Sequence, residues 1–153
     1  MGQGMPFITE AGAATPHVWV LPSEPASAGV LRQHLRALLV SLPAAQVDDV
    51  VLAASEGVAN AVLHGAGPVT VWVWPGRYGL RVEVTDNGGG TPQLAQAIDG
   101  QDEGGRGLFI VDKITNRWGV IPSNHGSGKT LWFEIDSAPD EMASHSGSHT
   151  LTP

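Results

Sequence analysis

The sequence contains no cysteine, and this absence removes several kinds of chemistry. Disulfide bonds, zinc sites built on thiolates and catalysis by a thiol are all excluded, which fits a reducing compartment. No apolar stretch approaches the roughly 18 residues of a membrane-spanning helix. The N-terminus also lacks the basic and then apolar order of a secretion signal. We therefore expect a cytoplasmic protein that has no membrane partner.

Basic residues are scarce as well, with 8 Lys and Arg against 15 Asp and Glu and a formal net charge of −7. Because positive charge draws a protein to a phosphate backbone, this balance argues against nucleic acid as a partner. Apolar residues, in contrast, are plentiful. They make up 42% of the 153 residues, and five residues are Trp. That content is enough for one hydrophobic core, so we predict one domain.

Helical and strand periodicities fill residues 16–136, whereas residues 1–15 and 137–153 are aperiodic and are predicted to be disordered ends. We predict strands at His17–Leu21, Val69–Trp74, Leu80–Thr85, Thr115–Ile121 and Lys129–Ile135, and helices from Ser23 or Ser27 to about Ser41, Ala44–His64 and Arg106–Ile114. Two helices come early and most strands come late. We therefore expect an α/β (α+β) sandwich of two layers, in which a mixed, mainly antiparallel sheet has its helices on one face.

The peptide GSGKT at 126–130 raises the question of a phosphate-binding P-loop. A P-loop needs a glycine five residues before Gly128, but Ser123 stands there. The residues after it alternate like a strand, and no helix comes next whose amide groups would face a phosphate. We therefore predict that Lys129 opens a strand.

Polar residues stand at two places where a ligand could be held. The helix 44–64 has a polar stripe with Glu56 and Asn60 nearly opposite its apolar face. The predicted strand Leu80–Thr85 runs into Asp86, Asn87 and three glycines, and strand alternation directs Asp86 toward the helices. A carboxylate beside glycines suits a planar group with an amino donor. A solvated helix face and a turn rich in Asp and Gly explain the same residues without a ligand.

A second glycine cluster, 104–107, reads Gly-Gly-Arg-Gly and leads directly into the third predicted helix. Backbone amide groups and the positive end of the helix dipole would face this loop, which suits an anion. Arg106 adds a charge that could hold phosphate oxygens in a forked geometry. The alternative is a flexible connection with a surface arginine.

The order of these motifs resembles the GHKL ATPase family, whose ATP-binding fold is called the Bergerat fold. The matching residues are Glu56 and Asn60 on a helix, Asp86, Gly88 and Gly90 after a strand, Gly105 and Gly107 before a helix, and Gly128 before the last strand. The resemblance covers about residues 16–136. The stretch SEGVANAVLHG at 55–65, together with the small size, is most similar to the anti-sigma-factor serine/threonine kinases.

The resemblance implies ATP and Mg²⁺ as cofactors. It implies that Asn60 is the Mg²⁺ ligand, that Glu56 is the catalytic residue that orients or deprotonates the attacking hydroxyl, and that Asp86 accepts a hydrogen bond from the adenine amino group. The other cofactor-binding residues that it implies are Gly88 and Gly90 beside the base and ribose, and Gly105, Arg106, Gly107 and Leu108 along the phosphates. The segment 91–103 would then be a mobile ATP lid.

One position departs from the family pattern. The family commonly has Thr directly after the glycine of the last strand, whereas here Lys129 stands there and Thr130 comes next. Alternation directs Lys129 inward together with Leu131. Either Lys129 lies in the nucleotide pocket as a cofactor-binding residue, or a bulge at the start of the strand restores Thr130.

The resemblance implies an ATP-binding protein of transcription regulation. It would be a serine/threonine kinase that phosphorylates an anti-sigma-factor antagonist and binds a sigma factor. The alternative is a catalytically silent nucleotide-binding module that sequesters a partner, although Glu56 favours the kinase because such a module needs no base. Strand parity places Trp72, Trp74 and Trp132 away from the helices. That placement predicts either a homodimer or partner interface, or a surface that the N-terminal segment covers.

Overall fold

The computed structural model describes residues 15–88, 103–124 and 126–137, with the side chains of 103–106 left out. In chain order the elements are β1 His17–Leu21, α1 Ser27–Leu38, α2 Ala44–His64, β2 Val69–Gly76, β3 Gly79–Asp86, α4 Glu103–Ile114, β4 Arg117–Pro122 and β5 Lys129–Asp136. The predicted bounds of β1 and α2 match residue for residue. The other elements differ from their predictions by a few residues at the ends. Nearly all of the two predicted disordered ends lies outside the described residues.

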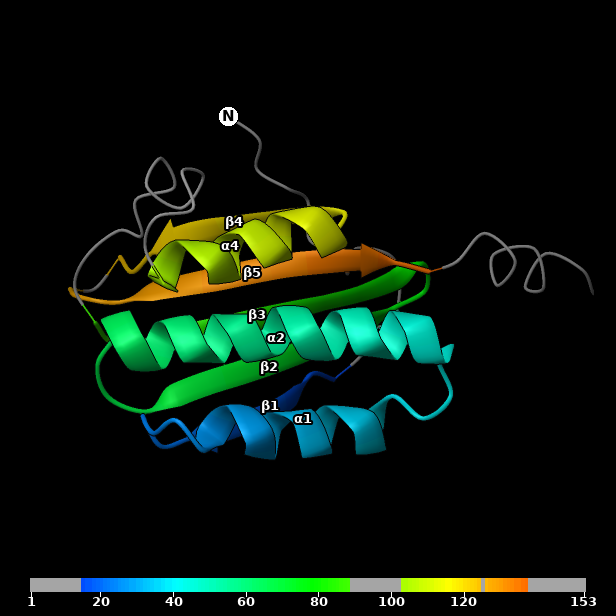
Figure 1. Ribbon diagram of the computed structural model, residues 1–153, viewed down its shortest axis with the longest axis horizontal. Coiled ribbons are helices and arrows are strands. Elements are labelled where there is room, and N and C mark those ends of the chain that lie inside the picture. The colour runs from blue at the N-terminus through cyan, green and yellow to red at the C-terminus, as the bar shows by residue number, and fades with distance from the viewer. Residues whose placement is uncertain (1–14, 89–102, 125, 138–153) are drawn as a thin grey trace, which may run out of the picture.

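The five strands form one sheet in the order β1-β2-β3-β5-β4 (Figure 1). Each neighbouring pair in it is antiparallel. The expected antiparallel majority is therefore confirmed, but no parallel pair occurs among the described strands. The reason is the position of β5. Strands β3 and β4 run in the same direction, as a crossover through α4 requires, but β5 lies between them and pairs with both.

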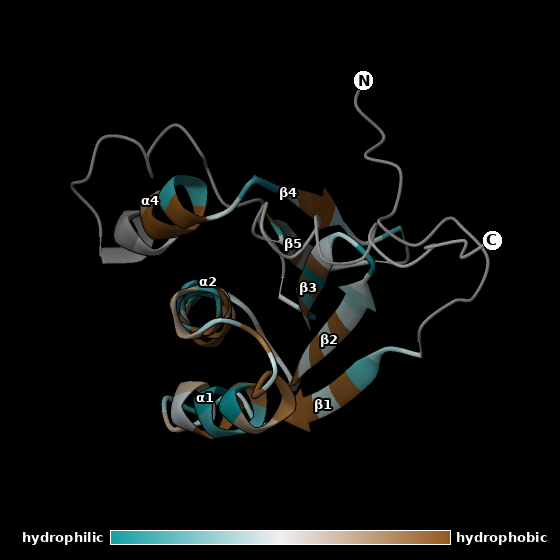
Figure 2. Cartoon of the chain, turned by 90° about the vertical axis from the view of Figure 1, so that its right-hand side faces the viewer, coloured by the Kyte–Doolittle hydropathy of each residue, from teal (hydrophilic) through white to brown (hydrophobic). Residues whose placement is uncertain are grey.

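The three described helices lie on the same face of the sheet, so the predicted two-layer sandwich is confirmed (Figure 2). The longest helix, α2, packs against both α1 and α4 and also against β2, β3 and β5. It is therefore the central element of the helical layer. None of the described helices is long and apolar enough to cross a bilayer.

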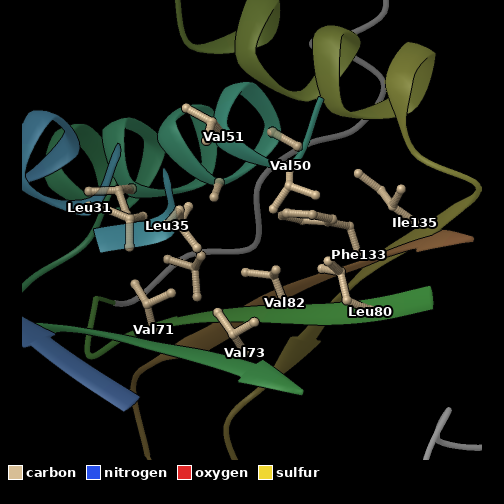
Figure 3. Packing of buried hydrophobic residues seen from close by; sticks show 14 of the residues in the cluster. Leu31, Leu35, Val50, Val51, Val71, Val73, Leu80, Val82, Phe133 and Ile135 are labelled. Carbon is tan, nitrogen blue, oxygen red and sulfur yellow. The ribbon is translucent and has the colours of Figure 1, made fainter. Parts of the chain in front are cut away.

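The hydrophobic core fills the space between the two layers. The side chains labelled in Figure 3 come from α1, α2 and three strands, and they are Leu31, Leu35, Val50, Val51, Val71, Val73, Leu80, Val82, Phe133 and Ile135. Alternate residues of β2 are buried here, which is the period of a strand with one covered face, and Leu80, Val82 and Val84 of β3 follow the same period. The helix α2 comes close to the sheet at Gly57. A Cβ at this position would lie 3.1 Å from Leu131 and 3.2 Å from Val84, so glycine allows the close approach.

The opposite face of the sheet carries charged residues that are buried although no helix covers them. Arg81 and Glu134 are only 8% and 3% exposed, and the Arg81 guanidinium donates to Glu134 at 3.0 Å. Arg81 also donates to Glu83 at 2.8 Å and lies over the ring of Trp132, 4.4 Å from its centroid. Arg117 donates hydrogen bonds to Glu134 and to Asp136, and both raise its pKa above the usual value. The bond to Glu134 has the larger effect. Each buried charge on this face therefore has a partner.

Trp72, Trp74 and Trp132 lie on the same face, as strand parity predicts. The rings of Trp72 and Trp74 stack with their centroids 6.1 Å apart. The indole N–H of Trp74 is buried and has no hydrogen-bond acceptor among the described residues. The first 14 residues lie outside the described part of the chain, so their predicted role as a cover stays a prediction.

Replacing Phe133 by Ala empties the middle of the core, because this ring is fully buried. We expect the free energy of unfolding to fall by about 3–5 kcal/mol, the usual cost of deleting a large core side chain. A urea titration followed by circular dichroism measures the loss. Phe109→Ala on α4 is the matched control, because this ring is 49% exposed and its removal should cost under about 1 kcal/mol. Equal losses in the two variants would show that Phe133 is not central to the core.

Candidate functional site

Several predicted site residues meet around a small cavity at one end of the sheet. Asn60 of α2, Asp86 of β3, Leu108 of α4 and Lys129 of β5 all line it. Its volume is about 10 Å³, which is room for about one water molecule. The rest of its lining is apolar or glycine. The structure thus brings together, from four separate elements, side chains that the sequence analysis assigned to one ligand.

Asp86 is the most enclosed polar residue of the site, with 3% of its surface exposed. It is the last residue of β3, and its Oδ1 accepts a hydrogen bond from the Gly88 backbone N–H at 2.7 Å. Gly65, just after α2, presses against the carboxylate, since a Cβ there would lie 2.6 Å from the Asp86 Cγ. A Cβ at Gly88 would lie 2.4 Å from the Gly65 Cα. The carboxylate is therefore held between two backbone segments that only glycine allows to meet.

Lys129 faces Asp86 across the pairing of β3 with β5. Its Nζ lies 3.1 Å from Oδ2 and 3.3 Å from Oδ1 of Asp86, and the lysine is 6% exposed. The pairing continues without interruption to Thr85 and Thr130, whose hydroxyl oxygens are 2.8 Å apart on the opposite face. Of the two alternatives, the structure therefore has Lys129 directed inward, and no bulge at the start of β5 turns Thr130 toward the site.

Gly128 explains how β5 can begin so close to Asp86. Its φ is +142°, a backbone angle that residues with a side chain rarely adopt. A Cβ there would lie 2.8 Å from the Asp86 backbone oxygen. The predicted strand start is confirmed by the structure, because the GSGKT peptide leads into β5 and not into a helix. A P-loop at this peptide is therefore excluded.

Glu56 lies one turn before Asn60 on α2, and both residues are half-buried. The Glu56 carboxylate lies against α4, because a Cβ at Gly107 would come within 2.9 Å of its Oε2. Glycine at 107 therefore lets a carboxylate fit between α2 and α4. This contact was not predicted from sequence, although the glycine pattern around 107 was its signal.

The start of α4 differs from the prediction. The helix begins at Glu103, so Gly104, Gly105 and Gly107 lie in its first turns and not in a loop before it. The first amide groups of a helix have no partner inside it, and they remain available to an anion although the glycines are helical. Gly90, residues 91–102 of the predicted lid and the side chain of Arg106 lie outside the described residues.

The described residues contain no group of three or more His, Asp or Glu that could hold a metal ion. Asn60 is the one predicted Mg²⁺ ligand. An Mg²⁺ ion bound there would take its other oxygen ligands from phosphates and water, which is how this ion is commonly bound beside nucleotides. The donor set therefore fits a metal that arrives with a phosphate ligand.

The ion pair between Asp86 and Lys129 is the main feature that sequence analysis missed. Inward parity of both residues was predicted, but their contact depends on the register between two strands 43 positions apart. No periodicity within either strand reports that register. The paired sheet sets this register: Val84 is opposite Leu131, and Asp86 is therefore opposite Lys129.

The chain matches the family described as "Histidine kinase-like ATPase domain" over residues 21–135. Among solved structures it is similar to the histidine kinase domain of a blue-light activated histidine kinase from Erythrobacter litoralis EL346. That match has a TM-score of 0.52 and 19% sequence identity, and it covers 92% of this chain and 76% of the other. It shows a shared fold. No curated protein sequence matches the chain.

Breaking the buried ion pair from one side should be costly. Lys129→Met leaves the Asp86 carboxylate buried without its cation, and we expect a loss of about 3–5 kcal/mol in the free energy of unfolding. The double variant Asp86→Asn with Lys129→Met removes both charges and should recover most of that loss. Urea unfolding at neutral pH measures the free energy of unfolding of the wild type, of Lys129→Met and of the double variant.

Arg36→Met is the matched control for this prediction. It breaks an ion pair with Asp48 of similar length, 3.0 Å, but the two side chains are 55% and 64% exposed. Its cost should stay under about 1 kcal/mol. A double variant as unstable as Lys129→Met would mean that the lysine stabilises the fold through its packing and not through its charge.

Proposed function

Because the chain belongs to the family of histidine kinase-like ATPase domains, we propose that it binds ATP at this cavity and transfers the γ-phosphate to a Ser or Thr of a partner protein. One observation carries the proposal. A buried carboxylate at a strand end, Asp86, lies in the same cavity as the amide of Asn60, beside the helix whose N-terminal amides suit phosphate. Nucleotide recognition needs these two polar contacts at the two ends of one ligand.

Asp86 would hold the base. Its Oδ1 is oriented by the Gly88 N–H, so the carboxylate is fixed before a ligand arrives. An ionised carboxylate only accepts hydrogen bonds, and the adenine amino group only donates them. The apolar lining from Val84 and Leu131 suits the faces of a planar ring.

Asn60 and α4 would hold the phosphates. The Asn60 amide oxygen is a neutral, hard ligand of the kind that Mg²⁺ accepts, and the first amides of α4 face outward from its N-terminus. Bound Mg²⁺ and ATP together supply the phosphoryl group and the charge that neutralises it. Gly107 brings the Glu56 carboxylate close to the same helix.

Glu56 would be the catalytic residue, because it is half-buried one turn from Asn60. A carboxylate so placed can orient an incoming hydroxyl and take its proton. The acceptor hydroxyl would come from a partner protein. By the resemblance of residues 55–65 we propose an anti-sigma-factor antagonist as that partner, with a sigma factor as the second partner and the tryptophan face as an interface.

A nucleotide-binding module without phosphate transfer is the second candidate. The small cavity favours it, since about 10 Å³ does not hold a purine and both oxygens of Asp86 are already within reach of Lys129. A base can enter only if the side chains of the cavity move. A change of shape on nucleotide binding is what a nucleotide-dependent switch requires, whereas phosphate transfer does not need it.

Asn60→Ala should weaken the binding of ATP with Mg²⁺ by about 10-fold or more, because a ligand of the metal and of its phosphates is lost. Calorimetric titration of ATP in the presence of Mg²⁺ measures this change. Asn116→Ala is the matched control, since this exposed residue lies on the loop before β4, where its Oδ1 accepts a hydrogen bond from the Asp136 N–H. Folded wild-type protein that binds no ATP would refute the proposed function.

Glu56→Gln should separate transfer from binding. The amide keeps the shape of the side chain beside Gly107 but cannot take a proton, so we expect ATP affinity within a few-fold of wild type. Phosphorylation of an antagonist protein by radiolabelled ATP should fall by about 10²- to 10⁴-fold. If the wild type binds ATP yet labels no antagonist, the silent module becomes the better description. Equal labelling by both proteins would remove Glu56 from its catalytic role.

A further inference from the structure

The ion pair of Lys129 with Asp86 occupies the place where the proposed function puts the edge of the purine ring. We propose that this pair binds purines that present a donor at position 6 and an acceptor at N1, and also purines that present an acceptor at position 6 and a donor at N1. The site would then bind 6-oxo purine nucleotides about as well as ATP. Lys129 is then a specificity-determining residue of the base pocket. This inference rests on the proposed function, because it requires a purine in the cavity.

A buried carboxylate by itself selects a 6-amino purine. Asp86 can only accept hydrogen bonds while it is ionised, so it suits the N6 amino group of adenine. A 6-oxo purine would bring its carbonyl oxygen toward the same negative charge, which is screened less in a buried site than in bulk water. Sites built around one polar partner reject a ligand that leaves that partner unpaired.

Lys129 changes this pattern because it places a donor beside the acceptor. The ammonium has three N–H donors and no acceptor, and it lies 3.1 Å and 3.3 Å from the two Asp86 oxygens. Both residues line the cavity, so both can contact a ligand there. The pair as a whole is neutral, so an uncharged base meets no uncompensated charge.

The two kinds of purine each match this donor and acceptor. A 6-amino purine presents a donor at its amino group and an acceptor at ring N1, which suit Asp86 and Lys129 in that order. A 6-oxo purine presents an acceptor at O6 and a donor at N1–H, which suit Lys129 and Asp86. The same two protein groups therefore satisfy either edge, with the base shifted by one position.

The shift is available because only one of the two groups is fixed. Asp86 is held by the Gly88 N–H and enclosed by Gly65, whereas the ammonium of Lys129 stands at the end of a flexible four-carbon stem. The cavity must enlarge to take a base, and Lys129 is its longest flexible side chain. By moving off one carboxylate oxygen, the lysine frees an acceptor and keeps its own donors beside the base.

Calorimetric titration with ATP and with ITP, each with Mg²⁺, tests the proposal. ITP has the 6-oxo edge without the extra 2-amino group of GTP, so it isolates the effect of the edge. For the wild type we expect dissociation constants within about 10-fold of each other. In Lys129→Thr, which removes the cation but keeps a hydroxyl that can donate to Asp86, ITP should weaken by about 10- to 100-fold more than ATP. Lys113→Thr, on the exposed side of α4, is the control for loss of one positive charge.

The outcomes separate this inference from the proposed function. Wild-type protein that binds ATP but binds ITP more than about 10-fold more weakly overturns the inference and leaves the ATP site intact. An unchanged ratio of the two constants in Lys129→Thr also overturns it. Folded protein that binds neither nucleotide overturns the proposed function itself. If Lys129→Thr does not fold, Lys129→Arg keeps the buried cation and must keep the wild-type ratio, which thermal unfolding with each nucleotide checks independently.

Discussion

The antiparallel pairing of β3 with β5 is the constraint on which the rest of the structure depends. This one register fixes three residue pairs along the two strands. It places Val82 beside Phe133 in the middle of the core, Val84 beside Leu131 under Gly57, and Asp86 beside Lys129 in the site. A shift of β5 by one residue would turn Lys129, Leu131 and Phe133 to the other face of the sheet. The stability of the core and the composition of the site therefore cannot vary independently.

The ion pair at the end of this register links stability to ligand binding. Two buried charges are costly to bring out of water, and each is tolerated because the other neutralises it. A ligand that contacts Asp86 therefore competes with a contact that stabilises the fold. A site of this kind has lower affinity for its ligand than an open one, because part of the binding energy is spent on separating the pair.

The helix α2 contributes residues both to the hydrophobic core and to the proposed functional site. Its apolar face is buried on the sheet, and its polar stripe presents Glu56 and Asn60 toward α4 and the cavity. Glycines make this double use possible at two contacts, because Gly57 brings the helix onto the sheet and Gly107 brings α4 onto Glu56. Small residues at these contacts position the polar groups more tightly than larger ones would allow. The opposite face of the sheet has a separate charged network around Arg81, so the two faces satisfy their buried charges by different partners.

The sequence by itself determined the elements and their faces. Period and turn signals were enough to give the bounds of α2, the inward parity of Asp86 and Lys129, and the two-layer class, because these depend on neighbours within a few residues. The tertiary structure decided which residues from distant parts of the chain contact one another. The placement of β5 between β3 and β4, the contact of Gly107 with Glu56 and the pairing of Asp86 with Lys129 all join residues far apart in the chain. Such contacts depend on packing and register, which local propensity does not encode.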